Sequence, residues 1–126
     1  VKLTPVTSSD EIVEIQRQID SVFAARELQE YIIDLVRRSR EHADLVLGAS
    51  PRAAINLMKA ARVHALLHGR NFLTHEDVQS VCLPVLSHRL IIRPESEMEG
   101  RTVTEIVKQL IQSVPVLTTA TTPRRM

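Results

Sequence analysis

Apolar residues recur at steps of three and four along most of the chain, which is the spacing that gathers them on one face of an α-helix. A run near the middle of the first half follows the i, i+3, i+4, i+7, i+8 pattern: Leu28, Tyr31, Ile32, Leu35 and Val36. Two further runs lie within residues 12–22 and 103–114. The pattern therefore predicts a helical protein.

Several helix starts are marked by a Ser or Thr that is followed three residues later by an acidic residue, the spacing of a capping box. These pairs are Ser8 with Glu11, Thr74 with Asp77, and Thr102 with Glu105. Two more helices are predicted, one over the run at 28–36 and its arginine-rich end, and one over an alanine-rich stretch at about 51–68. The chain is thus expected to contain five helices.

The connections between these helices are expected to be irregular. Residues 43–49 and 91–100 are predicted as loops, and Phe72-Leu73 as a short β-like stretch. Gly69 is expected to end the third helix, because glycine is common directly after a helix C-terminus. Pro84 lies inside the fourth helical pattern and is expected to kink or divide that helix.

The composition favours packed helices over a β-sandwich. Hydrophobic residues make up 44% of the chain but aromatic residues only 2%, so the core must consist of Leu, Ile, Val and Ala. The alanines of the third helix would let neighbouring helices approach closely, which places that helix at the centre of a bundle. The predicted fold class is all-α, a small bundle of about five helices.

A chain of 126 residues is expected to form one domain. Residues 1–7 are predicted to be an extended lead-in, 8–116 a helical domain, and 117–126, which are rich in threonine, a disordered tail. Because the chain starts at Val1 instead of methionine, we expect it to be a piece of a longer protein.

Net charge, cysteine content and hydropathy bear on which partners and which cellular compartment are expected for the protein. The net charge of +1 argues neither for nor against binding to nucleic acid. A single cysteine, Cys82, permits no internal disulfide and fits a reducing compartment. No apolar run approaches the length of a membrane span and no signal peptide is recognisable, so we expect a cytoplasmic protein without membrane insertion.

The chemistry that the sequence suggests centres on the stretch Gly48-Ala49-Ser50-Pro51-Arg52-Ala53. Ser50 is a preferred N-cap residue, and Pro51 suits the first helical position because its missing N–H is not needed there. Arg52 then lies in the first turn, where the helix dipole is positive and a cation is locally unfavourable. Such an arginine beside free N–H groups would suit a phosphate, while the alternative is a solvated arginine that follows a cap.

Other candidate groups have structural explanations beside the functional ones. The arginines at 37, 38 and 40 could bind phosphate, or could complement the negative end of their helix. His64 and His68 are one helical turn apart and could bind a metal, but no third ligand lies at a recognisable spacing, so no metal site is predicted. Cys82 falls on the apolar face of its helix and is interpreted as a core residue.

Four motifs in order resemble the C-terminal helical lid of MoxR-type AAA+ ATPases, and the resemblance spans about residues 5–116. They are the Tyr31-to-Val36 helix that ends in Arg37-Arg38-Ser39-Arg40, the Gly48-to-Ala53 stretch with its alanine-rich helix, Gly69-Arg70 before Thr74-His75-Glu76-Asp77-Val78, and Val85-Leu86-Ser87-His88-Arg89-Leu90. The helix between Gly100 and Pro115 fits the same family.

In that family the Ser-Pro-Arg element is the sensor 2 position. The resemblance implies that Arg52 is a catalytic residue that reaches the terminal phosphate of ATP, while Ser50 and Pro51 shape the helix start that faces the nucleotide. It also implies an upstream nucleotide-binding domain, neighbouring subunits in a ring such as a hexamer, and chaperone-like remodelling or maturation of partner proteins, among them von Willebrand factor A-domain proteins.

The chain departs from the family by lacking the parts that bind ATP and Mg²⁺. A P-loop needs a glycine followed by lysine, and the three glycines, Gly48, Gly69 and Gly100, are followed by Ala, Arg and Arg. No apolar strand ends in paired acids that could hold Mg²⁺. We therefore expect ATP and Mg²⁺ to bind the full-length protein, and this chain alone to bind neither and to be inactive.

Two other functions are open at this stage. The chain could be a stand-alone interaction module whose apolar groove receives a partner helix. It could also be a helix-turn-helix DNA-binding protein that uses the third and fourth helices. Glu76 and Asp77 at the start of the fourth helix argue against that reading, because a recognition helix meets phosphates there.

Overall fold

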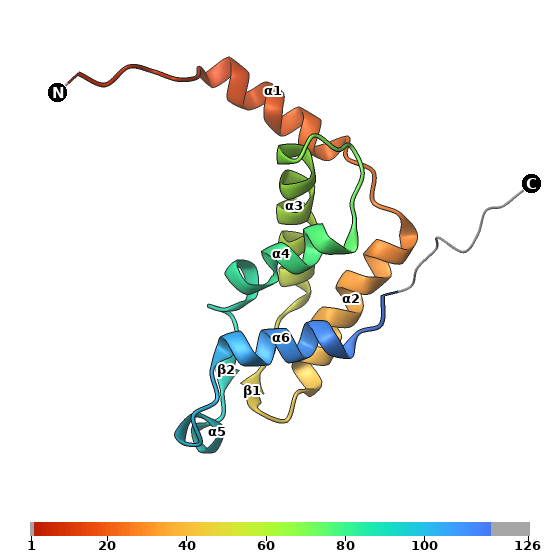
Figure 1. Cartoon of the computed structure of the whole chain (residues 1–126), viewed down its shortest axis with the longest axis vertical. Coiled ribbons are helices and arrows are strands. Elements are labelled where there is room, and N and C mark those ends of the chain that lie inside the picture. The colour runs from red at the N-terminus through yellow and green to blue at the C-terminus, as the bar shows by residue number, and fades with distance from the viewer. Residues whose placement is uncertain (1, 117–126) are drawn as a thin grey trace, which may run out of the picture.

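The computed structural model describes residues 2–116, which form six helices and one small sheet (Figure 1). In chain order the elements are α1 (Ser9–Asp20), α2 (Arg26–Glu41), β1 (Leu45–Leu47), α3 (Pro51–Leu67), α4 (His75–Leu86), β2 (Ile91–Ile92), α5 (Pro94–Met98) and α6 (Val103–Ser113). The predicted helical bundle is confirmed. The disordered tail predicted for 117–126 lies outside the described residues.

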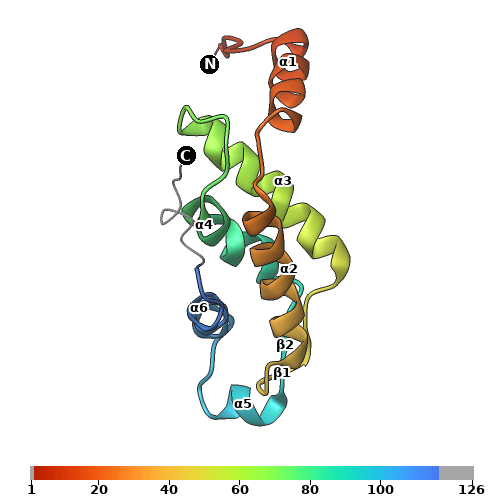
Figure 2. The same cartoon turned by 90° about the vertical axis from the view of Figure 1, so that its right-hand side faces the viewer.

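The predicted central position of the alanine-rich helix is also confirmed. α3 packs against α4 on one side and α2 on another, and α6 lies across α2 and α4 (Figures 1 and 2). Four residues one turn apart on α3 are completely buried, and three of them are alanines: Ala53, Leu57, Ala61 and Ala65. The small side chains let the neighbouring helices approach α3 closely.

The predicted caps set the starts of three helices. Ser8 and Thr74 each form a capping box, with Glu11 and Asp77 respectively. The hydroxyl of Thr102 accepts the N–H of Glu105 at 3.2 Å. α4 continues through Pro84 to Leu86, so the proline does not divide the helix. Pro84 is tolerated there because it lies in the last turn.

The two predicted loops contain regular structure, which corrects the sequence-based assignment. β1 pairs with β2 in an antiparallel sheet in which Leu45 faces Ile92, and α5 follows with Pro94 as its first residue. Asp44 holds this corner together: its carboxylate accepts the Ser96 hydroxyl at 2.8 Å and its carbonyl accepts the Arg93 N–H at 2.8 Å. The predicted β-like stretch is reduced to a single bridge between Phe23 and Phe72.

The first helix does not join the core. Ile12 and Ile15 belong to its predicted apolar stripe, yet they are 43% and 46% exposed, and no residue of α1 is buried. α1 lies beside the last turns of α3, at the opposite end of the molecule from β1, β2 and α5 (Figures 1 and 2). Its apolar side is therefore left uncovered by residues 2–116. None of the described helices has the length and hydropathy needed to cross a bilayer.

Candidate functional site

Arg52 lies on the surface in the first turn of α3, directly after Pro51 at the first helical position. Within residues 2–116 its guanidinium forms no ion pair, although acidic side chains pair with five other arginines: Arg17, Arg26, Arg37, Arg70 and Arg101. α3 has no acidic residue in its first turn, so Arg52 and the helix dipole place positive charge at the same point. This arrangement suits an anion that approaches from outside the chain.

Ser50 occupies the N-cap position of α3, but its side chain makes no capping hydrogen bond. Ser50 thus has the N-cap position that the sequence predicted, but the side-chain hydrogen bond that an N-cap serine usually accepts from a first-turn N–H is not formed. The Ala53 N–H instead donates to the carbonyl of Ser50 at 2.9 Å, which tightens the first turn. The hydroxyl of Ser50 is left available on the exposed side of the helix start.

A completely buried hydroxyl holds the segment that leads into α3. Ser39, near the end of α2, donates its hydroxyl to the carbonyl of Val36 at 2.6 Å and accepts the N–H of Ala49 at 2.8 Å. Ala49 is itself buried and lies one residue before the N-cap. The end of α2 thus fixes where α3 begins and, through it, where Arg52 stands.

Gly48 is needed at this crossing because two backbone segments nearly touch. A Cβ atom at position 48 would lie 2.6 Å from the Cα and N of Arg40 and from the carbonyl carbon of Ser39. Among the described glycines only Gly69 and Gly100 have a positive φ, so Gly48 is not needed for a left-handed backbone conformation. The absence of a side chain, and not an unusual backbone conformation, is what the site requires.

Two of the three arginines at the end of α2 have partners within the chain. Arg37 pairs with Asp34 at 3.0 Å, and Arg38 donates to the carbonyl of Ser113 at the end of α6. These contacts fit the structural explanation, in which cations stand at the negative end of a helix. Arg40 is exposed and forms no ion pair with a described carboxylate, but it stands at the negative end of α2. Arg52, at the positive end of α3, is therefore the better candidate for a phosphate.

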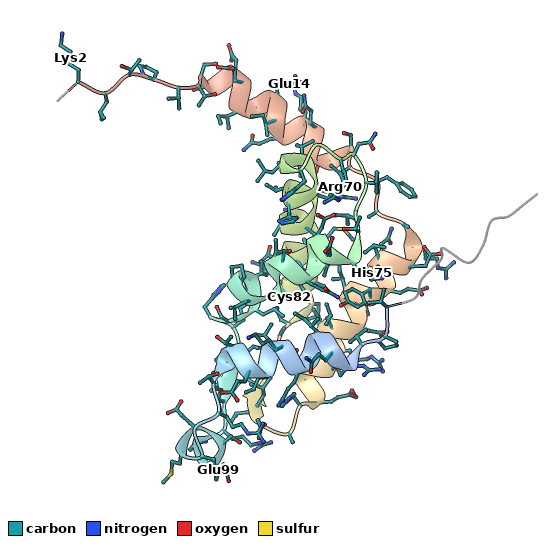
Figure 3. All side chains as sticks on the ribbon, in the orientation of Figure 1. Lys2, Glu14, Arg70, His75, Cys82 and Glu99 are labelled. Atoms are coloured by element: carbon teal, nitrogen blue, oxygen red, sulfur yellow. The ribbon has the colours of Figure 1, made fainter. Side chains whose placement is uncertain are left out.

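A second polar cluster links α3, the loop after it and α4. The carboxylate of Asp77 is fully buried and accepts two hydrogen bonds from Arg70, at 2.6 and 2.7 Å. It also contacts Nδ1 of His64 at 2.7 Å and accepts the N–H of Thr74 at 2.8 Å. Arg70 lies where the loop after α3 passes the start of α4 (Figure 3). This cluster joins three segments and is structural.

The surroundings of Asp77 keep it ionised. Burial alone would raise the pKa of Asp77, but the hydrogen bonds from Arg70, His64 and Thr74 hold that pKa well below its usual range. The hydrogen bond to Asp77 in turn raises the pKa of Arg70. The sequence indicated the Thr74–Asp77 capping box but not the convergence of residues 64, 70 and 77, which only the packing of α3 on α4 brings about.

The two histidines of α3 do not form a metal site. Their rings stack with centroids 4.3 Å apart, and Nδ1 of His64 faces Asp77 while Nδ1 of His68 faces the carbonyl of His64. In the part of the chain that the structure describes, no group of three His, Cys, Asp or Glu residues is arranged to hold a metal ion. Nδ1 of each ring is thus already engaged by a group of the same chain.

Cys82 is a core residue, as its position on the apolar face predicted. Its side chain is completely buried in the middle of α4 (Figure 3). Burial raises the pKa of the thiol to about 12, so the thiolate is not populated near neutral pH. The buried position excludes a role as an exposed nucleophile.

Comparison with known proteins identifies the family. The AAA lid domain family matches residues 37–110. The chain is 37% identical over 114 residues to the uncharacterized protein YeaC of Bacillus subtilis, covering 90% of this chain and 36% of that protein. It is 26% identical over 118 residues to the chaperone MoxR1 of Mycobacterium tuberculosis, covering 86% of this chain and 31% of that protein.

A solved structure agrees with the fold. The crystal structure of a candidate ATPase from Cytophaga hutchinsonii superposes with a TM-score of 0.85 and 31% sequence identity, over 90% of this chain and 37% of the other. The chain thus spans about a third of the length of the proteins it resembles. It belongs to the AAA lid domain family and corresponds to the helical lid of MoxR-type AAA+ ATPases.

Proposed function

We propose that this lid completes the nucleotide site of a MoxR-type ATPase by directing Arg52 at the γ-phosphate of ATP. The observation that supports this role most directly is the exposed Arg52 at the positive end of α3, which has no carboxylate partner within residues 2–116. An exposed arginine in a first helical turn that lacks acidic residues is locally unfavourable unless an anion approaches it. Ser50 and Pro51 contribute by shaping the helix start that faces the nucleotide.

The role of Arg52 would be electrostatic. In phosphoryl transfer, charge is spread over the oxygens of the transferred group, and a guanidinium placed beside them stabilises the transition state. ATP and Mg²⁺ would be held by a separate α/β domain, because this chain has no P-loop. The lid would therefore supply one charge to a site that another domain builds.

The same contact would tie the position of the lid to the state of the nucleotide. Only ATP offers a γ-phosphate, so the arginine would favour the closed lid before hydrolysis and release it afterwards. In a ring of subunits, such as a hexamer, this movement would drive chaperone-like remodelling or maturation of partner proteins. MoxR1 of Mycobacterium tuberculosis is named a chaperone. A von Willebrand factor A-domain protein is the partner that we propose from the family resemblance.

ATP turnover of the full-length protein tests the proposal. Arg52→Ala should lower the turnover number by roughly 10²-fold or more, by analogy with other arginines that face a transferred phosphate. Arg26→Ala is a matched control, because Arg26 is also exposed in the first turn of a helix but pairs with Glu30 at 3.1 Å. Its turnover should equal that of the unmodified protein.

Both variants should keep the unfolding temperature of the parent protein, since neither side chain is buried. Unchanged turnover for a folded Arg52→Ala protein would contradict the proposal. An equal loss of turnover in Arg26→Ala would show that any exposed helix-start arginine matters, and would remove the special role of Arg52.

A further inference from the structure

A small acidic pocket of about 70 Å³ lies where α2, the start of α4 and the chain after α6 meet. Three carboxylates line it from one face of α2, at steps of three and four residues: Glu27, Glu30 and Asp34. No lysine or arginine lines the pocket. One water molecule needs only about 10–15 Å³ of such volume, so a planar guanidinium group has room there.

The carboxylates of this pocket keep acceptor oxygens free. Glu27 is partly buried and forms no ion pair within residues 2–116. Glu30 uses Oε1 for Arg26 and Asp34 uses Oδ1 for Arg37, which leaves the second oxygen of each carboxylate. A partly buried carboxylate without a counter-ion is unfavourable, so the pocket suits a cation that comes from outside residues 2–116.

Two aromatic rings form another part of the pocket wall. The rings of Tyr31 and His75 meet edge to face with their centroids 4.8 Å apart (Figure 3). Burial lowers the pKa of His75, so its ring is uncharged near neutral pH and does not repel a cation. Nε2 of His75 is buried without a hydrogen-bond partner in residues 2–116. Aromatic faces and carboxylate oxygens together favour the guanidinium of an arginine.

The chain itself leaves the helical domain at the rim of this pocket, because Val114 and Pro115 also line it. Residues 117–126, which lie outside the described part of the chain, include Arg124 and Arg125 and no acidic residue. Arg124 comes nine positions after Pro115. A stretch of that length spans up to about 30 Å when extended, so it can turn back to the pocket. A short flexible connection gives an effective concentration in the millimolar range, which populates even a weak contact.

We propose that the acidic pocket binds the guanidinium of Arg124 or Arg125 of the same chain, between the carboxylates of α2 and the rings of Tyr31 and His75. The bound segment would cover the pocket and tie the end of α6 to α2 and α4. A second copy or a basic segment of another protein offers the same chemistry, but residues 117–126 of the same chain are already tethered at the rim. The proposal does not involve Arg52, so its test is independent of the phosphate role.

Backbone amide NMR signals of the isotopically labelled 126-residue chain test this docking. In a double variant, Arg124→Gln with Arg125→Gln, the amide signals of Glu27, Tyr31 and His75 should shift, because the cation leaves the pocket. The signals of β1, which lies outside the pocket, should stay in place. Both substitutions lie outside the described core, so the fold should be kept.

The reciprocal variant removes one carboxylate from the pocket. Glu27→Gln should shift the amide signals of Arg124 and Arg125. Glu97→Gln is the matched control, because Glu97 is exposed on α5, outside the pocket, and loses the same charge. It should leave those signals unchanged. In about 1 M NaCl, where charges are screened over roughly 3 Å, the pocket signals of the unmodified chain should move toward those of the double variant.

Unchanged pocket signals in the double variant would overturn the proposal. If an added short arginine peptide then shifted those signals, the pocket would belong to a basic segment of another protein. Shifts that fade on roughly tenfold dilution would also overturn it, because they would assign the arginine to a second copy of the chain. An equal effect of Glu27→Gln and Glu97→Gln on the signals of Arg124 and Arg125 would show that the pocket has no special role.

Discussion

The hydroxyl of Ser39 and the N–H of Ala49 are joined by a 2.8 Å hydrogen bond that ties the end of α2 to the start of α3. Both residues are buried, so water cannot replace either partner. Ser50, Pro51 and Arg52 follow Ala49 directly along the chain. The position of the proposed phosphate-directed arginine, Arg52, thus depends on one interior hydroxyl that lies thirteen residues earlier in the chain.

Ser39→Ala should destabilise the fold, because it leaves the buried N–H of Ala49 without an acceptor. The expected loss in the free energy of unfolding is about 1–3 kcal/mol, measured by urea denaturation. Ser113→Ala is the control: Ser113 also donates to a carbonyl three residues earlier, at 2.8 Å, but no loop N–H donates to its hydroxyl. It should lose at most about 0.5 kcal/mol. Equal losses in the two variants would show that the Ala49 contact is unimportant.

Gly48→Ala should be more disruptive than the substitution of a glycine at a turn. The added Cβ would lie 2.6 Å from backbone atoms of Ser39 and Arg40, which cannot move aside as a flexible side chain can. We expect a loss of roughly 3 kcal/mol in unfolding free energy, at the upper end of overpacking effects. Gly100→Ala meets no atom within 4 Å and should lose only about 1–2 kcal/mol, from its positive φ. The reverse order would contradict the close approach of the two segments.

Asp77→Asn should lower the free energy of unfolding and should also make that free energy depend less on pH in the acid range. The pKa of Asp77 lies below its unfolded value of about 3.9, so its carboxylate stabilises the fold above pH 4, and this contribution fades as the pH falls toward the folded-state pKa. At pH 7 the variant should lose roughly 3 kcal/mol, because Arg70 and His64 lose a charged partner.

Urea denaturation at a series of pH values between 7 and 2 measures both effects. Asp34→Asn is the control, because Asp34 makes a solvent-exposed pair with Arg37 that should contribute at most about 1 kcal/mol. If the unmodified protein and Asp77→Asn lost stability in parallel below pH 4, the carboxylate of Asp77 would not be the group responsible.

The helices were predictable because their signals are local. Each cap that the sequence marked with a Ser or Thr and an acid three residues later is formed at Ser8, Thr74 and Thr102. The apolar run from Leu28 to Val36 is buried as its period required. These features depend on residues that lie within one or two turns of each other.

The missed features depend on contacts between distant segments. β1 and β2 have three and two residues, too few for a period to show, and they exist because Leu45 meets Ile92. Glycine is needed at position 48 because the backbone at the end of α2 lies directly against it. The apolar side of α1 is exposed because no described segment covers it. The sequence selected Arg52 by its place after Ser50 and Pro51, but its lack of a carboxylate partner required the structure.

The most direct test of the account is a structure of the full-length protein with a non-hydrolysable ATP analogue and Mg²⁺. The account predicts that the guanidinium of Arg52 lies about 3 Å from an oxygen of the γ-phosphate, within hydrogen-bonding distance. If the nucleotide is bound and the lid is closed, but Arg52 points into solvent or pairs with a carboxylate of another domain, the central claim is contradicted.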